Sequence, residues 1–97
     1  MQRRSLLLVF FLCFFTNSFA SYILIPMDAK TQKNHLKAYG ITYWLLEQNQ
    51  KVKWLLNYRG GAFLVSDSKR IQNECLIRGV SYELISDSRT AEILEDI

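Results

Sequence analysis

The chain has 97 residues, 49% of them hydrophobic, and its 12 Lys and Arg against 9 Asp and Glu give a formal net charge of +3. Two of the basic residues lie in an apolar N-terminal segment, and residues 21–97 keep 10 basic against 9 acidic side chains, a charge of +1. This near-neutral balance excludes the basic surface of a nucleic-acid-binding domain, and the single cysteine of that part, Cys75, excludes an internal disulfide.

Residues 1–20 have the three parts of a Sec-type signal peptide. Two arginines form a basic start, residues 6–15 are an unbroken apolar run, and Ser18 and Ala20 are the small residues that a signal peptidase prefers. The apolar run, about ten residues, is too short to cross a hydrocarbon core of ~30 Å. We therefore predict cleavage before Ser21 and export to the periplasm or the medium, with no stable membrane anchor after cleavage.

The same segment has single features of two other export signals. Cys13 suggests a lipoprotein, but Phe11 and Leu12 precede it where a lipobox has small residues. The arginine pair suggests the twin-arginine route, but so apolar a segment favours the Sec route.

The first predicted elements are a strand and a long helix. Tyr22 to Ile25 is an apolar run rich in β-formers, which is typical of a buried strand. Asp28 stands at an N-cap position three residues before Thr31, and apolar spacing predicts a helix from residue 29 or 31 to about residue 49. Gly40 costs about 1 kcal/mol inside a helix, which favours a close approach to a sheet at that position.

The residues of this predicted helix fall into two neighbouring groups. One side of the helix carries Leu36, Tyr39, Gly40, Tyr43, Trp44 and Glu47, and the adjoining side carries Ala38, Ile41 and Leu45. We expect the core or its rim, and not a stacking platform, to hold Trp44, Trp54 and the tyrosines at 39, 43 and 58.

Residues 51–58 alternate polar and apolar side chains and predict a second strand, and residues 62–65 predict a third. A strand, a helix and a strand form a βαβ unit, which we expect to be right-handed and parallel. Gly60 and Gly61 leave two alternatives for the following step, a hairpin or a bend within one sheet edge.

Two Ser-Asp-Ser triplets, at 66–68 and 86–88, are signals for helix N-caps. The first precedes a predicted helix over 69–78 that ends at Gly79. A strand over 80–85 follows, and the second triplet precedes an amphipathic helix.

The predicted order, βαβ(β)αβα, belongs to the α/β class. It indicates a short, mostly parallel sheet with flanking helices. The apolar pattern still continues at Ile97 without a helix stop signal, so we expect residues 21–97 to be an N-terminal α/β domain or the first part of a larger one.

Ligands of open parallel sheets gather at the carboxyl ends of the strands. At those ends we find Asp28 and the segment of Asn57, Arg59, Gly60 and Gly61, which are the predicted ligand-binding residues; Ser66, Asp67, Ser86 and Asp87 follow the other two strands. Two glycines allow close backbone approach, backbone N–H groups can form an anion nest, and a guanidinium can bind a carboxylate or phosphate. The alternative is that Arg59 only holds a turn made by the glycines.

No catalytic motif, metal-binding spacing or cofactor fingerprint is present, so we expect no cofactor and assign no catalytic residue. His35 is predicted to be a surface or packing residue. Cys75 is predicted to be a small buried hydrophobe, because nothing nearby in the sequence would lower the pKa of its thiol.

The two halves of residues 21–97 differ in charge. Residues 21–59 carry +4 and residues 60–97 carry −3. Two solvated faces that attract one another explain this asymmetry better than a basic binding surface does.

Several strings of the sequence resemble the N-terminal part of exported bacterial proteins labelled "asparagine synthetase B". They are YILIPMD at 22–28, NHLKAYG at 34–40 with Gln32 before it, WLLNYRGG at 54–61 and CLIRGVSY at 75–82. The resemblance covers nearly all of residues 21–97, implies a longer protein, and places Asp28, His35, Asn57, Arg59, Gly60 and Gly61 in a shared pattern. It implies no catalytic residue here, because Gln2 follows Met1 where the synthetases have a cysteine nucleophile.

These observations leave two functions. The first is an exported binding or scaffolding module that recognises a small anionic ligand or an envelope protein through residues 57–61. The alternative is the N-terminal piece of an amidotransferase-like or hydrolase enzyme whose catalytic residues lie beyond Ile97.

Overall fold

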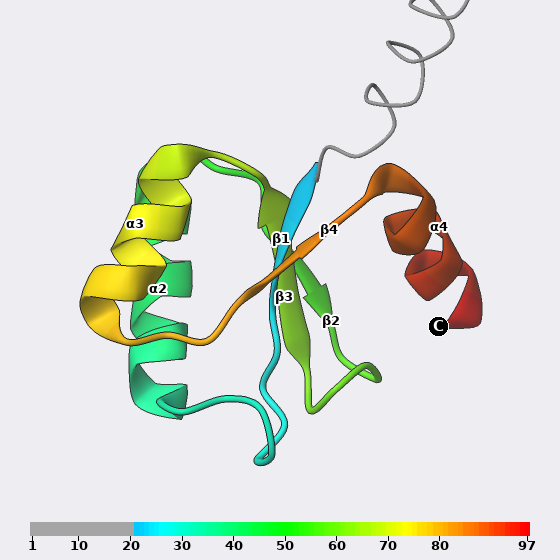
Figure 1. Cartoon of the computed structure of the whole chain (residues 1–97), viewed down its shortest axis with the longest axis horizontal. Helices are drawn as coiled ribbons and strands as arrows, with labels where there is room; N and C mark the ends of the chain where they lie inside the picture. Colours follow the sequence, from blue (N-terminus) through cyan, green and yellow to red (C-terminus); the bar gives the residue numbers. More distant parts are fainter. Residues whose placement is uncertain (1–20) are drawn as a thin grey trace, which may run out of the picture.

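A computed structural model describes residues 21–97, so the predicted signal peptide, residues 1–20, lies outside the described part. The described chain forms four strands and three helices (Figure 1). In chain order they are β1 (Tyr22–Ile25), α2 (His35–Glu47), β2 (Lys53–Leu55), β3 (Ala62–Ser66), α3 (Lys69–Arg78), β4 (Glu83–Ile85) and α4 (Asp87–Asp96).

The sheet has the strand order β2-β3-β1-β4, and every neighbouring pair is antiparallel. The prediction of a mostly parallel sheet is therefore wrong. β1 and β2 run in the same direction, but β3 lies between them. β3 and β4 also share a direction, and β1 lies between them. Two split βαβ units of this kind make the ferredoxin-like arrangement, to which α4 is added.

The two glycines close a hairpin between β2 and β3, which decides between the two alternatives for this step. Trp54 pairs with Phe63 and Leu55 with Ala62 across the hairpin. The strand β2 is shorter than the predicted 51–58 because the chain turns from Leu56 onward.

The predicted start of the long helix is also wrong. Asp28 accepts a hydrogen bond of 2.6 Å from the Thr31 hydroxyl and so closes a turn, and α2 begins only at His35. Asn34 is the N-cap, and its Oδ1 accepts the backbone N–H of Lys37 at 3.2 Å.

The caps of α3 and α4 confirm the two Ser-Asp-Ser predictions. Ser68 accepts the N–H of Ile71 at 3.1 Å, and Ser86 accepts the N–H of Arg89 at 3.2 Å. Gly79 ends α3 in the left-handed conformation at φ 70°.

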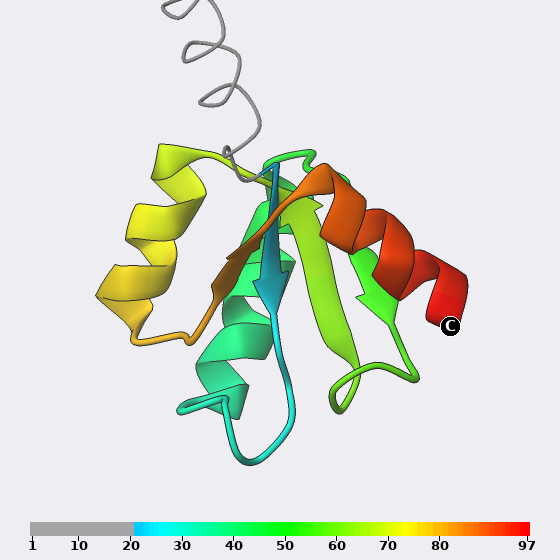
Figure 2. The same cartoon turned by 45° about the vertical axis from the view of Figure 1, so that its right-hand side comes forward.

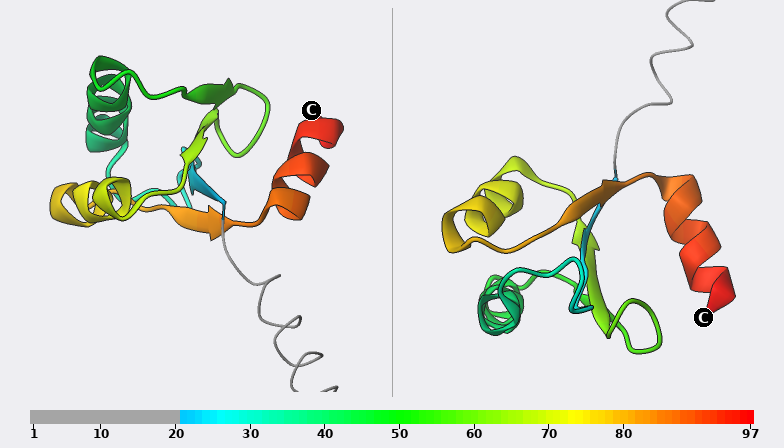
Figure 3. Two further views of the ribbon diagram at one scale, coloured as in Figure 1. Left: turned by 90° about the horizontal axis from the view of Figure 1, so that it is seen from above. Right: turned by 60° about the horizontal axis from the view of Figure 1, so that its bottom comes forward.

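The sheet is covered on both faces, so the molecule has three layers. Figures 2 and 3 show α2 and α3 on one face and α4 on the other. Because side chains alternate along a strand, β1 contributes to both cores. The core under α2 and α3 comprises Ile23, Ile25, Met27, Ala38, Ile41, Leu45, Phe63, Val65, Ile71, Cys75 and Val80. The core under α4 comprises Leu24, Leu55, Ala62, Leu64, Ile85 and Ile93.

Gly40 does not lie against the sheet, contrary to the prediction. It is exposed, and a Cβ built on it would meet only the guanidinium of Arg78 in α3, at 3.8 Å. The helix α2 instead contacts the sheet through Ala38, Ile41 and Leu45, which are at most 1% exposed.

Candidate functional site

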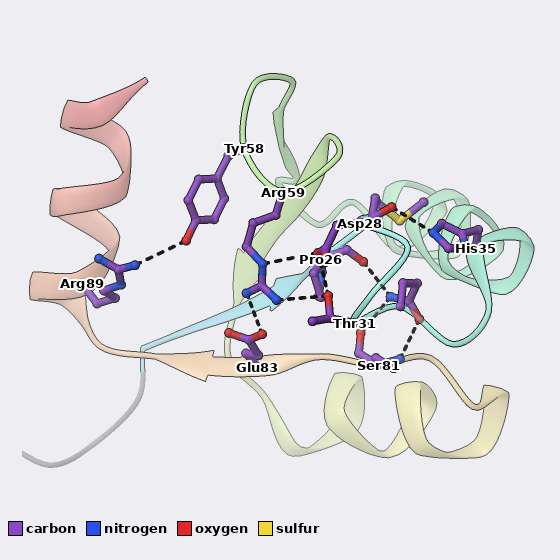
Figure 4. A network of polar contacts seen from close by, with 11 residues as sticks. Pro26, Asp28, Thr31, His35, Tyr58, Arg59, Ser81, Glu83 and Arg89 are labelled. Carbon is purple, nitrogen blue, oxygen red and sulfur yellow. Dashed lines mark hydrogen bonds and ion pairs between the residues drawn. The ribbon is translucent and has the colours of Figure 1, made fainter.

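The candidate site lies at one edge of the sheet, where β1 ends, β2 turns into β3 and β4 begins (Figure 4). The shared direction of β1 and β2 brings Asp28 together with Arg59 and Gly60, and Gly61 follows in the same turn beside Trp54. Asn57 is exposed in the same turn.

The other two predicted strand ends lie elsewhere. Because β3 and β4 run in the opposite direction, Asp67 follows β3 at the far edge, where its N–H donates to Ser21 O at 3.0 Å. Ile85 at the end of β4 accepts the N–H of Ser21, also at 3.0 Å. The expectation that four strand ends line one edge is therefore wrong.

Arg59 is bound through all three of its guanidinium nitrogens. Its Nη1 lies 2.6 Å from Oε2 of Glu83, and its Nε lies 3.4 Å from Oδ1 of Asp28. Its Nη2 donates to the hydroxyl of Thr31 at 3.1 Å. A single side chain thus joins the β2–β3 turn to the segment after β1 and to the first residue of β4.

The charges of this Arg59 cluster stabilise one another. Partial burial lowers the pKa of Arg59, but the hydrogen bond with Glu83 and the charges of Glu83 and Asp28 outweigh it, so the pKa is raised. The pKa of Asp28 is lowered, chiefly by the hydrogen bond from Thr31 and further by Arg59, against the effect of desolvation.

With one guanidinium and two carboxylates, the cluster has a formal charge of −1. An incoming anion would have to displace a carboxylate already bound at 2.6 Å or 3.4 Å. Anion binding by Arg59 stays a prediction, and the geometry favours the alternative in which Arg59 holds the turn.

Gly60 makes the close backbone approach that the glycine pair suggested, but the approach is to the protein's own chain. Its φ is +76°, and an added Cβ would lie 2.8 Å from Asp28 N and from Met27 C. The N–H of Met27 donates to Arg59 O at 3.0 Å, and Arg59 itself has the unusual φ of 45°. Gly61 accepts a hydrogen bond of 3.1 Å from the indole of Trp54.

A buried glutamine connects the same segments and was not predicted as a site residue. Gln32 is 4% exposed, and its Nε2 donates to Pro26 O at 2.8 Å and to Ser81 O at 3.0 Å. Its Oε1 accepts the N–H groups of Ser81 at 2.9 Å and of Asn34 at 3.3 Å. Gln32 belongs to one of the strings that carry the resemblance, and that was the only signal in the sequence.

His35 and Cys75 have the roles that were predicted for them. The His35 ring nitrogen Nε2 lies 2.9 Å from Met27 O and so packs the loop before α2. Cys75 is fully buried, and burial, helped by the charge of Glu74, raises the pKa of its thiol to about 11. A thiol with this pKa is protonated at neutral pH and is a poor nucleophile.

An open cavity of about 440 Å³ lies beside the end of α3, lined by Lys33, Leu76, Tyr82 and their neighbours. Within residues 21–97, no three His, Cys, Asp or Glu side chains are grouped as metal ligands. Over the same residues, no helix combines the length and the apolar character needed to span a bilayer.

Five exposed apolar side chains lie on α2 and β2, and we call them the α2–β2 apolar surface. Phe63 is its buried base, with an edge-to-face contact to Tyr39 at 6.0 Å and a stacked contact to Trp54 at 6.0 Å. The members and their exposed fractions are Leu36 84%, Tyr39 53%, Tyr43 67%, Leu46 54% and Trp54 58%.

In comparisons with known proteins, no family model, no curated protein and no solved structure matches the chain.

Proposed function

We propose that this chain is an exported scaffolding module that docks a protein partner through the α2–β2 apolar surface. In this proposal the Arg59 cluster is a structural clamp, not a ligand site. The observation that carries the proposal is the exposure of five large apolar side chains on α2 and β2, two of which, Tyr39 and Trp54, pack against the same Phe63 ring.

The size of this surface supports the proposal. A Tyr, Trp or similar side chain offers about 150–250 Å², so side chains between 53% and 84% exposed sum to roughly 600 Å². The largest apolar patch on a typical monomer is itself about 300–600 Å² and is often functional, so this surface is as large as the largest patches that monomers expose.

The helix that carries the surface supports the proposal in a second way. Its side toward the sheet is apolar, with Ala38, Ile41 and Leu45 buried, and its exposed residues are mostly apolar as well, apart from His35, Lys37 and Glu47. A helix that is apolar all round is typical of a buried position, whereas a helix facing water has a polar outer side.

The chemistry of the polar groups supports a role in binding over a role in catalysis. The guanidinium of Arg59 is bound within the protein, and the thiol of Cys75 is buried and protonated. Neither group offers a free nucleophile, base or anion-binding fork.

The proposal is tested by photocrosslinking in the native envelope. The full chain carries a benzoylphenylalanine in place of Tyr43, and in the matched control it replaces Leu76, which is equally exposed at 67% but lies on α3. We expect a discrete adduct from position 43 only, and we expect a second substitution, Leu46→Glu, to abolish it. Equal adducts from both positions, or none from position 43, would contradict the proposal.

A thermal-shift measurement with phosphate and small carboxylates tests the competing role of Arg59. We expect no anion to raise the melting temperature of the full chain. Stabilisation that is lost in Arg59→Ala but retained in Arg89→Ala would instead establish a ligand site at residues 57–61.

A further inference from the structure

We infer that the partner on the α2–β2 apolar surface is a second copy of this chain, with the two α2 helices packed antiparallel about a two-fold axis. The inference rests on the proposed function, because it names the occupant of the same surface.

The spacing of the exposed residues on α2 indicates helix-on-helix packing. Leu36, Tyr39, Tyr43 and Leu46 follow the i, i+3, i+7, i+10 pattern, which is that of the a and d positions of two heptads. These positions form the seam of paired helices. Here the seam is exposed, while the sheet is contacted by the opposite side of the helix.

The seam is also palindromic, which is the property that a two-fold interface requires. The midpoint between Leu36 and Leu46 is residue 41, and the midpoint between Tyr39 and Tyr43 is the same residue. In an antiparallel pair centred there, Leu36 of one copy meets Leu46 of the other at each end of the seam. Tyr39 meets Tyr43 between these ends. A two-fold interface uses the same patch on both copies, so self-complementarity of this kind is its signature.

The charge at the end of the seam favours the antiparallel direction. Glu47, the last residue of α2, is exposed. A parallel pair would place the Glu47 carboxylates of the two copies together, whereas an antiparallel pair separates them by the length of the seam. The helix dipoles also favour the antiparallel direction.

Two other occupants fit less well. A lipid surface would have to accept Glu47, which is exposed on the outer side of α2 next to the seam. Continuation of the sheet through the edge strand β2 is disfavoured by the exposed Lys53 in β2 and Lys51 just before it, because lysines of this kind protect edge strands from pairing.

The exposed area indicates a weak, reversible dimer. A surface of at most roughly 600 Å² per copy is smaller than the about 800 Å² per partner of a standard interface.

Sedimentation equilibrium of the full chain over a wide concentration range tests the inference. We expect a reversible dimer, and we expect Tyr43→Glu to raise the dissociation constant at least about tenfold, since seam residues of this type are interface hot spots. The matched control, Leu76→Glu on α3, should leave the dimer unchanged, and circular dichroism should show unchanged helix content in both variants. A dimer that survives Tyr43→Glu contradicts the inference.

Disulfide crosslinking tests the antiparallel direction separately. Leu36→Cys and Leu46→Cys variants should crosslink with each other faster than either variant crosslinks with itself, because residue 36 of one copy meets residue 46 of the other. Faster crosslinking of each variant with itself would contradict the antiparallel packing.

Failure of the inference can be distinguished from failure of the proposed function. A monomeric chain whose position-43 adduct contains a different protein retains the proposed function and removes the second copy. A monomeric chain that binds vesicles of phosphatidylglycerol and phosphatidylcholine through Tyr43 shows a lipid occupant and removes both. A monomeric chain with neither property also removes both.

Discussion

The close approach of Gly60 to the segment after β1 predicts a large and position-specific cost for a single methyl group. In Gly60→Ala the new Cβ would lie 2.8 Å from Asp28 N, 2.8 Å from Met27 C and 2.9 Å from Met27 O, at φ +76°. Gly79 is the matched control, because its φ of +70° is nearly the same and no atom lies within 4 Å of the corresponding Cβ.

Two costs set the size of the effect, one from the left-handed backbone conformation and one from the steric contact. A left-handed alanine costs roughly 1 kcal/mol relative to glycine, and this cost applies to both variants. At Gly60 the contacting atoms are backbone, so the turn must move away from Met27. Such overpacking costs about 1–3 kcal/mol, and loss of the 3.0 Å bond from Met27 N–H to Arg59 O adds about 1 kcal/mol.

We therefore expect the free energy of unfolding to fall by about 1 kcal/mol in Gly79→Ala and by roughly 3–5 kcal/mol in Gly60→Ala. Urea denaturation followed by circular dichroism measures both. At about 4–8 °C per kcal/mol for a domain of this size, the melting temperatures of the two variants should differ by more than about 8 °C. Equal losses in the two variants would refute the close packing of the β2–β3 turn against the segment after β1.

Three further predictions concern single side chains. Gln32→Ala should lower the free energy of unfolding by about 2–4 kcal/mol, because it strands buried backbone groups without partners; a loss below 1 kcal/mol in urea denaturation would contradict the bridging role. Arg59→Gly should be less destabilising than Arg59→Ala by about 1 kcal/mol, because glycine relieves the φ of 45°; equal losses would show that no strain exists there. The Cys75 thiol should not react with a disulfide reagent at neutral pH until the chain unfolds, and stability should fall as the pH rises from about 9 towards about 11, because the unfolded thiol loses its proton first. Cys75→Ala should remove that part of the pH dependence, and an unchanged slope would contradict the raised pKa.

A pH prediction in the opposite range concerns Asp28. Its pKa is lowered in the folded state, so its contribution to stability is complete above the pKa of the unfolded carboxyl, about 3.9, and is lost as the pH falls through the lower folded value. Asp28→Asn should therefore be less sensitive to acid than the wild type in pH-dependent urea denaturation. A steeper acid dependence in the variant would contradict the stabilising role of Arg59 and Thr31.

The parts of the fold that depend on local chemistry could be predicted from the sequence. Ser68 and Ser86 each cap a helix by accepting an N–H three residues later, and Gly79 supplies the left-handed residue at a helix end. Such contacts act between near neighbours in the chain, so they do not depend on how the sheet is arranged.

The arrangement of the sheet could not be predicted in the same way. A βαβ unit has the same local pattern whether its two strands are adjacent or separated by a third. Which of the two arrangements forms depends on strand pairing across the sheet, and here β3 pairs with both β1 and β2. That pairing joins residues far apart in the sequence, as Ile25 and Phe63 show.

The strand order also determines which residues form the candidate site. Asp28 and Arg59 could be placed together because β1 and β2 share a direction in either arrangement. Glu83 could not, because a parallel sheet would have put the start of β4 at the opposite edge. The guanidinium that looked free in the sequence therefore meets a second carboxylate in the structure, at 2.6 Å.

The sequence also does not show which side of α2 contacts the sheet, and the proposed function depends on the side that stays exposed. The helix has two apolar sides, and only one of them can contact the sheet. Ala38 lies on the sheet side and lets the helix approach closely, which leaves the larger Tyr39 and Tyr43 outside. Exposing apolar side chains to water costs about 25 cal/mol for each Å². A monomer with a second apolar surface of roughly 600 Å² carries this free-energy cost, and association that buries the surface removes it. The palindrome around residue 41 supplies a geometry for that association within the chain itself.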